Sequence, residues 1–146
     1  MTIIRKIAKH DVGVLVPLWM AMVNELNPGY QTPNPVWWMN DTMDLVMYED
    51  GYCGFLAEDE GVIVGFTDGI VYQDPARGAV VAWSRHTYIK PSHRHTSVTK
   101  DLFSSIYGDW RVKGARVVLF SCSDEVLPLW LAHGYKIIEN VMMGVI

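Results

Sequence analysis

Three strand-like runs follow one another in the middle of this chain, and helix-like segments lie on both sides of them. Tyr52–Glu58 and Val62–Gln73 are rich in β-branched and aromatic residues, and Glu58-Asp59-Glu60-Gly61 between them has the composition of a turn. We therefore expect an antiparallel hairpin here. A further loop at 74–78 leads to a third strand over Ala79–Ile89. Any fold for this chain must accommodate three successive strands in its centre.

The N-terminal part predicts one strand and two helices. Residues 2–8 alternate and are β-branched, which is typical of a strand. Apolar residues then recur at three- and four-residue spacing as far as Leu26, which predicts a helix with Asp11 as its cap. Pro17 interrupts this pattern, and we expect a kink or a late helix start there. After a loop rich in Pro and Asn, a second helix is expected over about Val36–Tyr48.

Four elements are predicted for the rest of the chain. They are a helix over about Arg94–Val112, an apolar buried strand over Ala115–Cys122, a short helix over about Glu125–Ala132 and a last strand over Tyr135–Ile146. Gly114 and Gly134 end the two helices, and Ser123-Asp124 is the expected cap of the second. The order β-α-α-β-β-β-α-β-α-β over 146 residues predicts an α/β (α+β) fold in a single domain, residues 1–146.

The composition is that of an ordinary globular protein and excludes several classes. The formal net charge of −4 argues against nucleic-acid binding, which normally uses a basic surface. No apolar run is long enough to span a membrane, and no secretory signal opens the chain. Cys53 and Cys122 lie too far apart in sequence to suggest a disulfide framework. We expect a cytoplasmic protein with free thiols.

The junction after the third central strand carries the clearest functional signal. Tyr88-Ile89-Lys90-Pro91 ends a strand, and the residues from Arg94 onward begin a helix. A helix start offers unpaired N–H groups and the positive end of its dipole, which together suit a pyrophosphate. Arg94 adds a permanent positive charge, and Ser97 and Thr99 add hydroxyl donors. An ordinary strand–turn–helix junction of another α/β fold is the alternative.

This stretch resembles the acetyl-CoA motif of the GNAT superfamily of N-acetyltransferases, Val-x-Pro-x-x-Arg-x-x-Gly-x-Gly/Ala. Ile89, Pro91 and Arg94 match in register, whereas Ser97 and Thr99 replace the two glycines. The resemblance implies a mixed, mostly antiparallel central sheet with helices on both faces, and acetyl-CoA as acyl donor. The coenzyme A contacts that it implies lie at Tyr88, Ile89, Arg94, His95, Thr96, Ser97, Val98 and Thr99.

A second stretch, from Ser123 to Tyr135, resembles a later motif of the same family. Leu129 and Gly134-Tyr135 fit this motif, whereas Ser123 stands where Asn is common. Trp130 occupies the position of the Tyr that is proposed to protonate the departing thiolate. An indole N–H has no useful acidity, so Trp130 is expected to contact the cofactor or to be a core aromatic.

The family mechanism, applied to this sequence, suggests His86 and Tyr88 as catalytic residues. Main-chain N–H groups near Thr87 and Ile89 would bind the thioester, and a base would remove the amine proton. His86 is the best local base because its ordinary pKa is near neutrality, although a structural histidine is the competing interpretation. Tyr88 is the substitute proton donor. The histidines at 86, 93 and 95 lack the pattern of a metal site.

The acceptor is expected to be a primary amine of a small molecule or a protein. The resemblance places its binding in the first two helices and their loop, where Tyr30 and Trp37 are the aromatic candidates. Arg85, if it faces the cleft, would favour an acceptor that carries a carboxylate or a phosphate. The apolar C-terminal segment suggests a homodimer. A GNAT-like fold that has lost catalysis and serves as a binding module is the rival hypothesis.

Overall fold

Within residues 1–26 and 32–138, which the structure describes, a computed structural model shows a five-stranded sheet in the order β1-β2-β3-β4-β5. Neighbouring strands are antiparallel except β4 and β5, which are parallel. The strands are β1 (Thr2–Lys6), β2 (Tyr52–Asp59), β3 (Val62–Asp74), β4 (Ala79–Ile89) and β5 (Val117–Leu119), and the helices are α1 (Val12–Leu26), α2 (Pro35–Tyr48), α3 (Val98–Val112) and α4 (Leu127–Ala132). The predicted mixed, mostly antiparallel sheet is confirmed, as is the β2–β3 hairpin.

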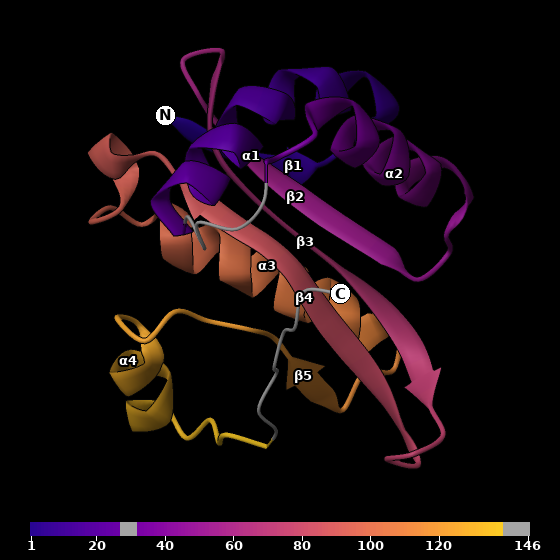
Figure 1. Cartoon of the computed structure of the whole chain (residues 1–146). Coiled ribbons are helices and arrows are strands. Elements are labelled where there is room, and N and C mark those ends of the chain that lie inside the picture. Colours follow the sequence, from indigo (N-terminus) through magenta and orange to yellow (C-terminus); the bar gives the residue numbers. More distant parts are fainter. Residues whose placement is uncertain (27–31, 139–146) are drawn as a thin grey trace.

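Helices cover both faces of this sheet, as predicted (Figure 1). On one face, Phe66 of β3 and Tyr88 of β4 pack with Leu15 of α1 and Trp38 of α2. On the other face, α3 buries an apolar stripe against the sheet: Val98, Leu102, Ile106 and Trp110. The sheet therefore separates two cores, and the side to which each β4 side chain points decides which core it joins.

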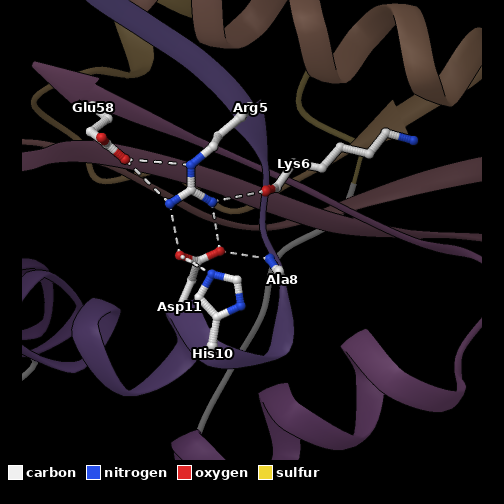
Figure 2. Close-up of polar contacts among 6 residues, drawn as sticks. All are labelled: Arg5, Lys6, Ala8, His10, Asp11 and Glu58. Atoms are coloured by element: carbon white, nitrogen blue, oxygen red, sulfur yellow. Dashed lines mark hydrogen bonds and ion pairs between the residues drawn. The ribbon is translucent and has the colours of Figure 1, made fainter. Parts of the chain in front are cut away.

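A partly buried ion pair fixes β1 to the start of α1 (Figure 2). The Arg5 guanidinium donates to both carboxylate oxygens of Asp11, at 2.8 and 2.9 Å, and also to Glu58 of β2. The Ala8 N–H donates to the same Asp11 carboxylate at 2.8 Å. These hydrogen bonds, with that of Arg5 the strongest, hold the pKa of Asp11 below its ordinary value. The carboxylate of Asp11 thus turns back to β1 and Ala8, which differs from the simple cap predicted for this residue.

Helix α1 contains Pro17 and nevertheless begins at Val12, so the predicted late start is wrong. Proline inside a helix removes one main-chain hydrogen bond and crowds the preceding turn. Val12 and Leu15 of the first turn are fully buried in the core beside Trp38. Their packing against the sheet therefore outweighs the local cost of Pro17.

Helix α3 begins at Val98 rather than at the predicted Arg94. Pro91–His93 forms a 3-10 turn instead, and the hydroxyl of Thr96 donates to the carbonyl oxygen of His93 at 2.6 Å. This local bond competes with helical pairing of the same carbonyl. The residues that match the family motif thus lie in turns ahead of the helix.

The C-terminal third departs most from prediction. Strand β5 is limited to Val117–Leu119 instead of Ala115–Cys122, because only these residues pair with β4. Helix α4 begins at Leu127 with Val126 as its cap, and the side chain of Ser123 makes no capping bond. Residues 135–138 of the predicted last strand carry no regular structure, and the rest of that prediction lies outside the described residues.

Gly69 of β3 is needed for the close packing of α3, which gives a stability prediction. A Cβ atom at Gly69 would lie 2.5 Å from the carbonyl oxygen of Trp83 and 2.7 Å from Cζ2 of Trp110. We expect Gly69→Ala to lower the free energy of unfolding by about 1–3 kcal/mol, measured by urea unfolding. Gly108→Ala, in α3 with nothing within 4 Å, is the control and should stabilise by about 0.5–1 kcal/mol. A Gly69→Ala protein as stable as the wild type would contradict this account.

Candidate functional site

The sheet splits between β4 and β5. Strand β5 pairs with β4 only through Val81, Ala82 and Trp83. Beyond Trp83, β4 continues to Ile89, and along this edge no strand of residues 1–26 or 32–138 lies beside it. Half of β4 therefore has an open edge.

Main-chain groups of β4 point out of this open edge. The Lys90 N–H donates to the Val64 carbonyl of β3 at 2.8 Å. Main-chain groups of successive residues in a strand face opposite edges, so those of Ile89 and Thr87 face away from β3. Their N–H groups are hydrogen-bond donors directed into the split.

The turn after β4 leaves half of its amides without partners. The amides at 94, 96 and 98 are engaged at 3.3–3.4 Å: Arg94 with Pro91, Thr96 with His93 and Val98 with the hydroxyl of Thr96. Those of His95, Ser97 and Thr99 have no acceptor within the described part of the chain. The hydroxyl of Thr99 turns back to the Arg94 carbonyl at 3.4 Å, and His95, Thr96 and Ser97 are exposed. The side chain of Val98 is buried in the α3 core and leaves only its main chain for a ligand.

Arg94 lies at the open edge, but an acidic residue engages it. Its Nε donates to the Ile89 carbonyl at 2.9 Å, and its guanidinium carbon lies 5.5 Å from the centre of the Tyr88 ring. Its Nη2 donates to both carboxylate oxygens of Glu25, at 2.7 and 2.8 Å. Glu25 is in the last turn of α1, and both side chains are partly exposed. An incoming diphosphate would therefore compete with Glu25 for Arg94.

Tyr88 lies beneath this ion pair and is largely buried. Its hydroxyl donates to Glu25 at 3.4 Å. Burial, reinforced by the charge of Glu25, raises the pKa of Tyr88. The phenol therefore remains protonated at neutral pH and acts as a donor.

A β-bulge in β4 brings His86 and Arg85 to the same buried carboxylate. Asp68 pairs with His86 and Gly69 with Ser84, so Arg85 is the extra residue. His86 Nδ1 lies 2.8 Å from Asp68 Oδ1, and Arg85 donates to Asp68 Oδ2 at 3.0 Å. The bulge allows two consecutive residues of β4 to bind one side chain of β3.

Arg85 is paired at both ends of its guanidinium. Its other amino group donates to Asp41 of α2 at 2.8 Å, and only 12% of its side chain is exposed. The charge of Arg85 is thus already compensated by two carboxylates. An acceptor that carries a carboxylate or phosphate would have to displace Asp41 to reach it.

His86 lies on the face of the sheet covered by α1 and α2. Its ring contacts Trp38 edge-on at 5.9 Å and Phe66 at 6.2 Å between centres. Nε2 makes no hydrogen bond to any residue in 1–26 or 32–138. One nitrogen of the imidazole is therefore committed to Asp68, and the other has no hydrogen-bond partner within the described residues.

Three further residues were predicted for the site from the sequence: Trp130, Trp37 and Tyr30. Trp130 is part of an aromatic cluster with Phe103, Phe120 and Tyr135, with ring centres 4.7–5.8 Å apart. Trp37 of α2 is 75% exposed, unlike the adjacent Trp38 of the core. Tyr30 lies outside the described residues.

Four residues of the site were not predicted from the sequence: Asp68, Tyr52, Asp41 and Glu25. A signal for Asp68 was present, because a carboxylate interrupts the otherwise apolar centre of the strand Val62–Asp74. A charge at such a position requires a partner. Glu25 had no comparable signal, because acidic residues are ordinary on helix surfaces.

The described residues form neither a membrane-spanning helix nor a cluster of metal-ligating side chains. No helix among them is long and apolar enough to cross a membrane. No group of three or more His, Cys, Asp or Glu side chains in the described ranges could hold a metal ion.

Comparison with known proteins identifies the fold. No family model matches the sequence, and a search of curated proteins gives no match. Solved structures do match over nearly the full length. A predicted acetyltransferase from Clostridium acetobutylicum, solved with acetyl-CoA, has a TM-score of 0.84 at 11% identity, with 99% of this chain and 96% of that chain covered.

Two further solved structures match this chain over nearly its full length. An acetyltransferase from Trypanosoma brucei has a TM-score of 0.75 at 19% identity, with all of both chains covered. The aminoglycoside N-acetyltransferase AAC(6′)-Iy, in complex with CoA, has a TM-score of 0.75 at 22% identity, with 99% of this chain and 94% of that chain covered. At such low identities the likeness establishes the fold alone. The chain has the fold of the GNAT superfamily of N-acetyltransferases, as the strand–turn–helix junction at Ile89–Arg94 predicted.

Proposed function

We propose that this protein is an acyl-CoA-dependent N-acyltransferase that transfers an acetyl group from acetyl-CoA to a primary amine. The observation that carries the proposal is the open edge of β4, which presents main-chain donors in the same half of the strand as His86. Solved neighbours of the same fold include structures with acetyl-CoA or CoA. The acceptor belongs to a small molecule or a protein.

Main-chain groups hold the donor substrate in this proposal. The N–H groups of Thr87 and Ile89 would orient the thioester and its pantetheine arm along the β4 edge. The free amides at 95, 97 and 99, the start of α3 and Arg94 would bind the diphosphate. Ser97 and Thr99 are compatible with this role because their amides, not their side chains, supply the contacts. Trp130 would line the cleft with the aromatic cluster.

In this proposal His86 is the proton acceptor and Tyr88 is the hydrogen-bond donor to the leaving group. His86 Nε2 would accept the proton of the attacking amine, because Nδ1 is held by Asp68. The amine then attacks the thioester carbon, and the C–S bond breaks. Tyr88, which keeps its proton, would donate a hydrogen bond to the departing thiolate. Both side chains lie on the same face of β4, two residues apart.

The acceptor would enter over α2. Trp37 is exposed there, and Asp41 offers a partly exposed carboxylate beside the buried Arg85. An aromatic face and a carboxylate both favour an ammonium group. We accordingly propose that Trp37 and Asp41 contact the acceptor and that Arg85 holds Asp41 in place.

The proposal is tested by measuring donor binding and turnover separately. Acetyl-CoA should raise the melting temperature in a saturable manner. Over a panel of primary amines, at least one acceptor should then release free coenzyme A thiol above the rate without amine. Absence of a thermal shift at millimolar acetyl-CoA would refute the donor site.

A catalytically impaired binding module is the second candidate. It is favoured by the replacement of both motif glycines and by the Glu25–Arg94 ion pair. Saturable stabilisation by acetyl-CoA without thiol release from any amine would support this alternative.

Two substitutions with opposite effects test the assignment of the diphosphate site. Arg94→Ala should weaken coenzyme A binding by about 10–100-fold, because charge-assisted hydrogen bonds are worth roughly 1.5–3 kcal/mol. Glu25→Gln should strengthen it by about two- to fivefold, because it frees Arg94 from a partly exposed ion pair. Isothermal titration calorimetry measures both. Equal affinities in all three proteins would place the diphosphate elsewhere.

Placement in the cytoplasm and formation of a homodimer stay predictions. The C-terminal segment on which the dimer prediction rests, residues 140–146, lies outside the described residues. Size-exclusion chromatography with light scattering would test the dimer.

A further inference from the structure

Asp68 is a fully buried carboxylate for which the sequence-based mechanism has no role. It lies in the middle of β3, and only 1% of its side chain is exposed. Oδ1 faces His86 Nδ1 at 2.8 Å, and Oδ2 accepts from Arg85 at 3.0 Å and from the Tyr52 hydroxyl at 3.1 Å. Three side chains from two flanking strands thus converge on one carboxylate.

The backbone around Asp68 is arranged to permit this convergence. Gly54 of β2 lies directly opposite Asp68, and a Cβ atom there would be 2.7 Å from the Tyr52 hydroxyl oxygen. The missing side chain leaves the space through which Tyr52 reaches Asp68. On the other side, the bulge at Arg85 turns both Arg85 and His86 to the same partner. Gly54 and the bulge at Arg85 thus both allow neighbouring side chains to reach the Asp68 carboxylate.

The charges around the cluster determine which atoms carry protons. Burial opposes a charge on Asp68, but His86 and Arg85 outweigh it and hold the pKa of this carboxyl below its ordinary value. Burial and the Asp68 charge raise the pKa of Tyr52, so the phenol is a donor. Asp41 of α2 lies beyond Arg85 and is the other charge that faces the cluster. Asp68 is therefore ionised and only accepts hydrogen bonds.

From this geometry we infer that Asp68 is a positioning residue that holds His86 with its proton on Nδ1 and its lone pair on Nε2. The inference rests on the proposed transferase function for its catalytic meaning. An ionised carboxylate beside Nδ1 stabilises the N–H there and thereby selects the tautomer. Trp38 and Phe66 then fix the plane of the ring. Nε2 is then the nitrogen that can accept the amine proton, and Asp68 stabilises the imidazolium that forms.

The tautomer can be measured without any substrate. Nitrogen-15 NMR of histidine-labelled protein distinguishes the Nδ1–H, Nε2–H and doubly protonated forms of imidazole, so spectra recorded over a range of pH identify the neutral form of His86 and its tautomer. The wild type should show His86 as the Nδ1–H form. In Asp68→Asn, the amide N–H can donate to Nδ1, so we expect the Nε2–H form to gain population. Tyr52→Phe, which removes another ligand of Asp68 but leaves the imidazole contact, should retain the wild-type tautomer. A wild-type His86 in the Nε2–H form would overturn the inference.

Steady-state kinetics provide a second test of the positioning role of Asp68. Asp68→Asn should lower kcat by about 10²-fold or more with the KM for acetyl-CoA within about threefold, because only proton transfer is impaired. Tyr52→Phe should stay within about fivefold of wild type in kcat. Circular dichroism and the melting temperature confirm that both variants fold.

Failure of the inference and failure of the proposed function are distinguishable. If the wild type acetylates an amine and Asp68→Asn does so at the same rate, the positioning role is wrong and the transferase proposal stands. If the wild type releases no thiol with any amine but shows the Nδ1–H form, which Asp68→Asn loses, the positioning of His86 is supported and the transferase proposal fails.

Discussion

His86→Ala is expected to lower kcat by about 10²–10⁴-fold while coenzyme A binding changes by less than about threefold. A positioned general base contributes rate enhancements of about this size. His86 is held by Asp68, Trp38 and Phe66 on the face opposite α3 and makes no described contact with the turn at 94–99, so its loss should leave the donor site intact. Release of coenzyme A thiol measures kcat, and calorimetry measures binding.

His10→Ala is the matched control for this prediction. The side chain of His10 is 80% exposed beside Asp11 at the start of α1. Its removal should leave both kcat and coenzyme A affinity at wild-type values. If His86→Ala turns over as fast as His10→Ala, His86 is a structural histidine and another group or water removes the amine proton.

Asp68→Ala is expected to lower the free energy of unfolding by about 3–5 kcal/mol at pH 7, measured by urea unfolding. The substitution breaks a buried ion pair and removes the carboxylate to which the Tyr52 hydroxyl and His86 Nδ1 are bound, and costs of this size follow from breaking such a pair. Arg85, with 12% of its side chain exposed, would keep only Asp41 as a partner. Asp44→Ala is the control, because Asp44 is exposed on the same helix as Asp41, and its effect should stay within about 0.5 kcal/mol.

The stability difference between the wild type and Asp68→Ala should depend on pH, and the lowered pKa of Asp68 gives the direction of this dependence. The pKa of Asp68 is lower in the folded protein than in the unfolded chain, where it is about 3.9. Its contribution to stability is therefore complete above about pH 4 and is lost as the pH falls through the folded-state pKa. The stability difference between wild type and Asp68→Ala should narrow below about pH 4. A difference that is under 1 kcal/mol at pH 7, or that widens in acid, would contradict the assigned ion pair.

Local sequence patterns predicted the elements of this fold well in its first two thirds. The three central strands lie within one residue of their predicted ends, because alternation and turn residues such as Gly61 act over a few positions. Predictions failed where a tertiary contact opposed a local preference. Pro17 is inside α1 because Val12 and Leu15 are buried, and β5 is short because β4 pairs with only three of its residues.

The candidate site was only partly predictable for the same physical reason. His86, Tyr88 and Arg94 could be selected from residue type and from their place at a strand–turn–helix junction. Their partners could not, because Asp68 lies 18 residues from His86 and Glu25 lies 69 residues from Arg94. The expected role of Arg85 changed most. Its guanidinium is bound to Asp68 of β3 and Asp41 of α2 and is not free to bind an acidic acceptor.

The sequence by itself determined the order of elements as far as α4 and the residue types at the junction from Ile89 to Thr99, because short-range periodicity and turn residues act within one segment. Only the tertiary structure decided that β4 bulges at Arg85, that β5 leaves the β4 edge open, and that Asp68 binds His86. These three features depend on pairing between strands that are distant in the chain. Register and the burial of a charge are settled only when the strands meet.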